Sequence, residues 1–159
     1  MYRVSTEGID DLLKKLEKAG NGAQGVAASG LYEGACIMAD AVSQSIRGID
    51  TEKFRYANGW QRRASPEEKA LLENAPKGVA KFRKNGLEVN TSVGLDKAGY
   101  GTLNGKTVPI PQIANAINSG TSFRVKQPFF RKAVSQTKSK AIAVIDNAIE
   151  KKVEDIFKD

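Results

Sequence analysis

The sequence predicts an α+β protein in which two long helices, at about residues 23–47 and 128–157, pack with shorter helices and a small antiparallel sheet. Apolar residues recur at spacings of three and four through both long stretches, which is the pattern of a helix with one buried face. Residues 87–95 alternate with period two instead, as a half-buried strand does. No Gly or Pro occurs after Pro128, so nothing there forces the second long helix to stop.

Composition excludes several kinds of site. The chain has no histidine, which excludes catalytic triads and dyads that use a His and zinc sites that use His ligands. Cys36 is the one cysteine, so no internal disulfide can form, and its place in an apolar helical pattern predicts a small buried residue. We expect no cofactor and no catalytic activity.

Length and hydropathy favour one domain, 1–159, with a loop-rich segment at 47–64 and a protruding loop at 96–108. No apolar run approaches the roughly 18 residues that span a bilayer. The N-terminus lacks the apolar segment of a secretory signal. We therefore expect a soluble, intracellular protein that does not contact a membrane.

Positive charge is concentrated in the middle of this chain, whose net charge is +7. Residues 75–140 hold twelve Lys and Arg against two acidic residues, Glu88 and Asp96. Such a segment can hold a protein near nucleic acid or an acidic partner, and an ordinary solvated surface explains it equally well. The residues that would face DNA in the first case are Lys81, Arg83, Lys84, Arg124 and Lys126.

The N-terminal third predicts two amphipathic helices, at 7–18 and 23–47. The second contains Gly25, Gly30 and Gly34, each of which costs about 1 kcal/mol relative to Ala in a helix. These glycines form a smooth face that lets the C-terminal helix approach closely; the alternative is that they weaken or kink their own helix. The expected buried stripe of this helix is Val26, Leu31, Ala35, Met38, Val42 and Ile46.

Residues 47–64 are predicted to form a loop in which aromatic and arginine residues are interleaved. Such a mixture can stack on nucleic-acid bases, but aromatic side chains that anchor the loop are the favoured interpretation. A helix then begins after Ser65, which is the N-cap, and Glu68 completes a capping box three residues later. This helix is expected to end before Pro76.

A β-hairpin is expected between residues 79 and 95. Residues 79–82 form its first strand, Asn85-Gly86 supplies the positive φ values of a type I′ turn, and residues 87–95 form its second strand. Residues 96–108 are polar and Gly-rich. We expect an exposed loop or a second hairpin there.

The C-terminal region predicts a short helix at 112–117, a turn at 118–122 and the second long helix. Pro128 suits the first helical position, because its missing N–H would have no partner there. The short helix is expected to bury Ile113, Ala116 and Ile117. The long helix is expected to bury Phe130, Val134, Thr137, Ala141, Ile145 and Ala148, with Ile142, Ile149, Val153 and Ile156 beside them.

Three motif-like patterns fail as catalytic or nucleotide-binding sites. Residues 101–106 have three residues between their glycines, where a phosphate-binding loop needs four. Ser135 and Lys138 match the Ser-x-x-Lys pattern of acyl-transfer enzymes without its companion motifs. Glu67 and Glu68 are adjacent carboxylates near a helix start, where solvated charge is expected. These patterns nominate no enzyme.

Two segments carry a resemblance: Asn118-Ser119-Gly120-Thr121, and Gln127-Pro128-Phe129-Phe130-Arg131-Lys132-Ala133. Together they resemble the C-terminal signature of the minor tail-component, or head–tail joining (tail completion), family of long-tailed phages and prophages. Its members typically show a Gly-Thr turn, a short spacer, Arg-Pro-Phe-Leu and a C-terminal helix. Gln127 replaces the usual Arg, and the Pro-x-Asp-Thr-Gly pattern expected after the second helix is missing. The matching residues are Gly120, Thr121, Pro128, Phe129 and Phe130.

The resemblance implies a structural protein whose copies assemble into a ring at the head–tail junction or tail end. Its expected partners are tail-tube, terminator or connector proteins, and its expected location is the virion, after assembly in the host cytoplasm. The basic middle segment would suit a ring through which DNA passes. The alternative function is a small basic nucleic-acid-binding protein that uses the same residues.

Overall fold

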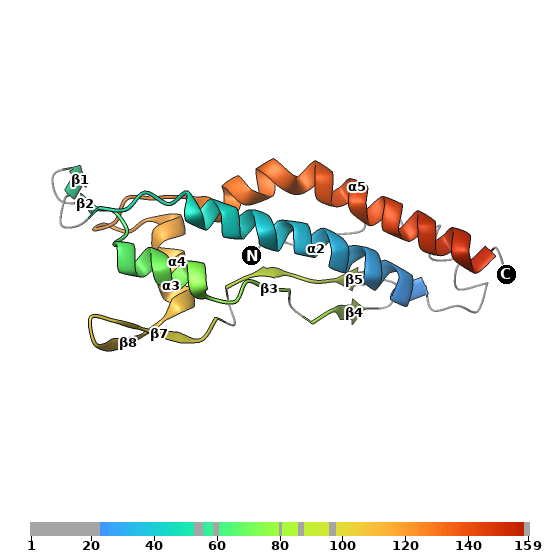
Figure 1. Ribbon diagram of the computed structural model, residues 1–159, viewed down its shortest axis with the longest axis horizontal. Helices are drawn as coiled ribbons and strands as arrows, with labels where there is room; N and C mark the ends of the chain where they lie inside the picture. Colours follow the sequence, from blue (N-terminus) through green and yellow to red (C-terminus); the bar gives the residue numbers. More distant parts are fainter. Residues whose placement is uncertain are drawn as a thin grey trace. The chain divides into compact units, whose positions relative to one another are not determined.

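The computed structural model describes residues 23–52, 56–58, 61–79, 81–85, 88–95 and 98–157 (Figure 1). The helix expected at 7–18 lies outside the described residues. The described helices are α2 (Ala23–Arg47), α3 (Pro66–Asn74), α4 (Ile110–Ser119) and α5 (Phe129–Phe157). Two long helices with short antiparallel strand pairs confirm the predicted α+β class. None of the described helices has the length and apolar content that a bilayer span requires.

The described strands are short and pair two by two rather than as one sheet. Antiparallel pairing joins β1 to β2, β4 to β5, and β7 to β8, and β3 pairs with β6. The strands are β1 (Tyr56–Asn58), β2 (Gln61–Arg62), β3 (Gly78–Val79), β4 (Arg83–Asn85), β5 (Glu88–Asn90), β6 (Val93–Gly94), β7 (Tyr100–Leu103) and β8 (Lys106–Pro109).

The chain divides into two compact units. Unit 1 comprises Met1–Met38, Val79–Val93 and Thr137–Asp159, and unit 2 comprises Ala39–Gly78 and Gly94–Gln136. Each unit has a hydrophobic core of its own. The two units are therefore described separately.

Unit 1 packs the first part of α2 against the last part of α5 through two glycines. A Cβ on Gly30 would lie 2.9 Å from Cγ1 of Ile149, and a Cβ on Gly34 would lie 2.6 Å from Cδ1 of Ile145. Both distances are shorter than van der Waals contact, so glycine is what lets the helices approach. The predicted smooth face is confirmed at these two positions, whereas Gly25 has no such neighbour. The buried residues of this core are Val26, Ala27, Leu31, Val89, Ile145 and Ile149.

The hairpin predicted between residues 79 and 95 is present with shifted boundaries. Asn85 is a strand residue that pairs with Glu88, so it is not the first residue of the turn. The first strand is residues 83–85 rather than 79–82. The second predicted strand is divided into β5 and β6, because the two pieces pair with different strands.

Unit 2 surrounds its core with the end of α2, with α3 and α4, and with the start of α5. The helix α4 begins at Ile110, two residues earlier than predicted, and buries Ala114 where Ala116 was expected. The core residues are Ala41, Val42, Ile46, Ile49, Ala64, Leu72, Ala75, Leu95, Ile110, Ile113, Ala114, Ile117, Phe129 and Ala133.

The burial of α2 follows its predicted pattern closely. All six residues predicted to line the buried stripe are buried. Cys36, which was also expected to be buried, is half-buried, because it lies at the edge of that stripe.

The segment 96–108 contains the second hairpin that was one of its two expected forms. Leu103 pairs with Lys106, so Asn104 and Gly105 make the turn. Their φ values of 51° and 75° are both positive, as a type I′ turn requires. Asn104 and Gly105 therefore form an Asn-Gly turn of the type that was expected at Asn85 and Gly86.

The buried row of α5 is offset by one residue from the predicted one at the start of the helix, where Phe129 and Ala133 are buried in place of Phe130 and Val134. Phe129 is 3% exposed, whereas Phe130 is half-buried. The row that faces the cores continues from Phe129 at intervals of four residues, which leaves Ile142 at 43% exposure. The prediction that Ile142 is buried was wrong. Ala141 and Ile145 are buried as predicted.

Candidate functional site

A carboxylate at the start of α3, that of Glu68, is the centre of the strongest polar cluster in unit 2. Ser65 is the N-cap: its Oγ accepts a hydrogen bond from the Glu68 N–H at 3.1 Å. The Glu68 Oε2 in turn accepts one from the Ser65 N–H at 2.9 Å. This capping box was predicted, and it turns the Glu68 side chain back over the start of its helix.

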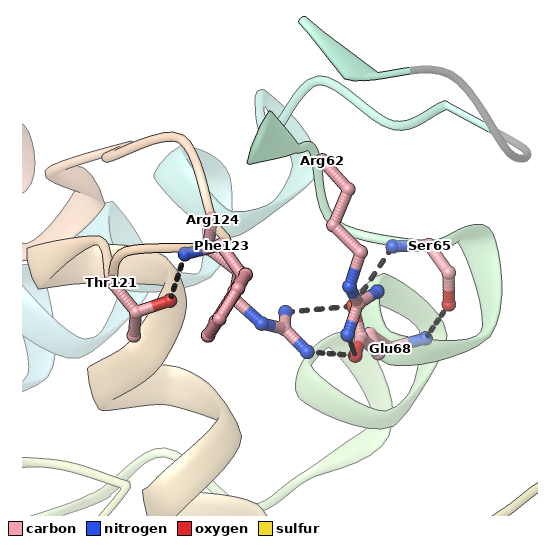
Figure 2. A network of polar contacts seen from close by, with 6 residues as sticks. All are labelled: Arg62, Ser65, Glu68, Thr121, Phe123 and Arg124. Atoms are coloured by element: carbon pink, nitrogen blue, oxygen red, sulfur yellow. Dashed lines mark hydrogen bonds and ion pairs between the residues drawn. The ribbon is translucent and has the colours of Figure 1, made fainter. Parts of the chain in front are cut away.

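Two arginines approach that carboxylate from other parts of the unit (Figure 2). Arg124 donates from Nη1 to Oε2 of Glu68 at 2.8 Å and from Nη2 to Oε1, which is a bidentate pair. Arg62 donates to the same two oxygens at the longer distances of 3.2 and 3.5 Å. Glu68 is 1% exposed. The expectation that Glu68 is solvated was wrong, because both arginines and the capping box enclose it.

The environment of Glu68 keeps it ionised. Burial alone raises the pKa of its carboxyl group, but the hydrogen bonds from Arg124 and Ser65 and the positive charges of Arg124 and Arg62 lower it by more. The pKa of Glu68 therefore lies below its ordinary value. Near neutral pH the Glu68 carboxylate is therefore charged and does not act as a proton donor. Glu68, Arg62 and Arg124 together form an ion-pair cluster, the charged lock.

The lock fixes the segment between α4 and α5. The Arg62 N–H donates to the Phe123 carbonyl at 2.9 Å, and the Val125 N–H donates to the Arg62 carbonyl at 3.0 Å. Residues 123–125 thus lie alongside β2 as a short parallel ladder, while Arg124 reaches Glu68 on α3. One carboxylate thus joins β2 and α3, which are close in sequence, to residues 123–125, which are distant.

A tight turn begins this segment. Gly120 has a φ of +74°, and a Cβ at this position would lie 2.9 Å from Cβ of Lys126. The Thr121 N–H donates to the Arg124 carbonyl, and the Arg124 N–H donates to the Thr121 carbonyl, each at 3.2 Å. The Phe123 N–H donates to Oγ1 of Thr121 at 3.2 Å. Glycine is required because both the positive φ and the close backbone exclude a side chain.

The far end of the segment is held by two side-chain amides. Oε1 of Gln127 accepts from the Asp50 N–H at 2.8 Å, and its Nε2 donates to the Asp50 carbonyl at 3.0 Å. Oδ1 of Asn118 accepts from the Phe130 N–H at 3.1 Å, which caps the start of α5. Gln127, which stands where the phage-protein signature has Arg, and Asn118 therefore both bind backbone here.

The structure places the five family-like residues in this segment and at the start of α5. Gly120 makes the turn, and Thr121 and Pro128 are exposed. Phe129 enters the core, and its ring centroid lies 4.7 Å from that of the half-buried Phe130. Within the segment, Phe123 is 68% exposed. No sequence pattern singled out Phe123 as a functional residue.

The five basic residues proposed to face DNA are divided between the units. Lys81 and Arg83 are exposed residues of unit 1, and Lys126 is an exposed residue of unit 2. The side chain of Lys84 lies outside the described residues. Arg124 differs from the others, because its side chain is 13% exposed and paired with Glu68.

The charged lock was not predicted from the sequence, although the predicted capping box is a local signal for part of it. A capping box implies that the Glu side chain folds back onto the helix start, so Glu68 cannot point freely into solvent. Arg62 lies six residues before Glu68 and Arg124 lies 56 residues after it, and no helix or strand periodicity pairs either arginine with this carboxylate. In the described part of the chain, no group of three or more Cys, Asp or Glu residues is arranged to hold a metal ion.

A scan against protein-family models found no matching family, and searches of curated proteins and of solved structures found no match.

Proposed function

We propose that this chain is a non-catalytic structural protein of a phage or prophage, acting at the head–tail junction or the tail end. One support is the resemblance carried by residues 118–121 and 127–133. The observation that carries the proposal is the exposed Phe123 on a segment that is locked at both ends. Phe123 thus lies in the spacer between the two stretches that bear the resemblance, and that spacer presents its side chain outward.

A locked segment with an exposed aromatic residue suits binding to protein. Aromatic residues and arginine are enriched where proteins bind one another, and they supply much of the binding energy. A segment that is already fixed loses little conformational entropy on binding. Glu68, Gln127 and the Gly120 turn supply that fixation here.

The proposed partners are copies of the chain in a ring and the tail or connector proteins beside it. Ring assembly uses two different surfaces of each copy, so that contacts repeat head to tail until they close. The proposed location is the virion, with the host cytoplasm as the place of assembly. No cofactor is needed for this role.

Co-expression with the tail-tube, terminator and connector proteins encoded beside the gene tests the proposal. We expect one of them to co-purify with the chain in a complex of fixed mass. A gene without such neighbours, or a chain that co-purifies with none of them, contradicts the proposal.

A small basic nucleic-acid-binding protein is the second candidate, favoured by the exposed Lys81, Arg83 and Lys126. Proteins of this kind bind more weakly as salt rises, because each neutralised phosphate releases counterions. A DNA titration at increasing salt separates the two candidates. A monomer whose DNA affinity falls steeply with salt supports nucleic-acid binding.

A further inference from the structure

Arg62 and Phe123 belong to the same short ladder, in which the Arg62 N–H donates to the Phe123 carbonyl at 2.9 Å. The Phe123 side chain is 68% exposed and the Arg62 side chain 45% exposed. A protein partner of ordinary size covers about 800 Å² on each side. A partner of this size that docks on the ladder has area enough to reach both side chains.

Arg62 is only partly engaged inside the molecule. A guanidinium group has five N–H donors, and Glu68 accepts from two nitrogens of Arg62, at 3.2 and 3.5 Å. Arg124 makes the shorter bond to the same carboxylate, at 2.8 Å. Arg62 is thus positioned by Glu68 but keeps donors for a second carboxylate, whose planar shape its fork matches.

The local charge favours a protein partner over nucleic acid. Oδ2 of Asp50 and Oε1 of Glu52 each lie 3.8 Å from Nη1 of Arg63. Glu68 is paired with Arg62 and Arg124. Among the described residues around the ladder, the basic ones therefore exceed the acidic ones by only one: Arg62, Arg63, Arg124 and Lys126 against Asp50, Glu52 and Glu68. Nucleic-acid sites are strongly positive, because phosphate contacts supply most of their affinity.

We infer that the surface formed by Arg62 and Phe123 docks a segment of another protein that presents a carboxylate beside an apolar side chain. The carboxylate binds the outer donors of Arg62, and the apolar side chain covers the ring of Phe123. This inference names the partner chemistry of the proposed assembly role and rests on that proposal.

A random peptide library displayed on yeast, selected on the full-length chain and counter-selected on Phe123→Ser, tests the inference. We expect the enriched peptides to share an Asp or Glu next to an aromatic or aliphatic residue. Fluorescence anisotropy with the most enriched peptide should show affinity reduced about 10-fold or more by Arg62→Gln and by Phe123→Ser. Tyr100→Ser and Arg63→Gln are the matched controls, since they remove another exposed aromatic residue and the neighbouring arginine, and they should change the affinity little.

Circular dichroism melting of each variant checks that it folds. Arg62→Lys adds a second measurement, because it keeps the charge beside Glu68 and loses the fork, and it should also weaken the peptide.

Three results overturn the inference. The first is a set of enriched peptides without acidic residues, or binding that Arg62→Gln and Phe123→Ser leave unchanged. The second is self-association, measured by light scattering, that Phe123→Ser abolishes, which makes a second copy the occupant. The third is DNA oligonucleotide binding that the same two variants abolish. Co-purification with phage proteins is a separate readout, so the assembly role and this partner chemistry can fail independently.

Discussion

Arg124 binds the carboxylate of Glu68 with both terminal nitrogens of its guanidinium group, although 56 positions separate the two residues in the chain. This pair, together with Arg62, fastens the segment between α4 and α5 to the start of α3. The following predictions test what the pair and the helix contacts contribute.

Glu68→Gln should lower the free energy of unfolding by about 3–5 kcal/mol, because removing one member of a buried ion pair leaves the others uncompensated. Urea unfolding at neutral pH measures the change. Asp40→Asn is the control: its side chain is exposed on α2 in the same unit, so its effect should stay within about 0.5 kcal/mol. Equal effects of the two substitutions would show that the buried cluster adds no stability.

The contribution of Glu68 should also depend on pH. The pKa of Glu68 is lower in the folded protein than its ordinary 4.5, so the unfolded chain takes up this proton first as the pH falls. The stabilisation is thus fully present above about pH 4.5 and is lost as the pH drops through the lower folded pKa. Urea unfolding at several pH values should show the wild type and Glu68→Gln converging in acid. A difference that stays constant down to pH 3 would contradict the lowered pKa.

Gly34→Ala should destabilise the protein by about 1–3 kcal/mol, because the new methyl group would overlap Ile145 and would lie 3.2 Å from the Ala141 carbonyl oxygen. Gly25→Ala is the matched control in the same helix. Its added methyl group would meet no neighbouring element within 4 Å, so this change should be neutral or stabilise by up to about 1 kcal/mol. Thermal unfolding of both variants measures the difference, and a stabilised Gly34→Ala would rule out the close helix contact.

Phe129→Ala should cost about 3–5 kcal/mol, as expected for a buried aromatic residue. Phe130→Ala should cost less, because its ring is half-buried. Urea unfolding of the two variants tests the one-residue offset of the buried row. A larger loss of unfolding free energy for Phe130→Ala than for Phe129→Ala would contradict the offset and support the buried row expected from the sequence.

Local sequence patterns predicted the helices and the capping box well. The helix α2 has the bounds and the buried stripe that its periodicity indicated, and the box at Ser65 and Glu68 is present. Both features depend on residues that are close in the sequence. Of the two roles that the sequence left open for the glycines of α2, the close helix contact is found at Gly30 and Gly34 but not at Gly25.

Features that depend on distant residues were predicted less well. Phe129 and Phe130 are both apolar, so their spacing could not decide which one enters the core. The pairing of Arg124 with Glu68 needed the fold itself, since no periodicity links a residue of α3 to one beyond α4. Two Asn-Gly pairs offered equivalent turn signals, and only strand pairing shows that Asn104 and Gly105 make the turn.

Amide hydrogen exchange at Arg62 and Val125 tests most directly whether Glu68 holds the segment between α4 and α5 in place. Each of these N–H groups donates across the ladder that the charged lock fixes, to the carbonyls of Phe123 and Arg62 respectively. In Glu68→Gln, both amides should exchange at least about tenfold faster than in the wild type, because local opening of the segment becomes easier by about 1.4 kcal/mol or more. Exchange as slow in the variant as in the wild type, in a protein that remains folded, would contradict the role given to Glu68.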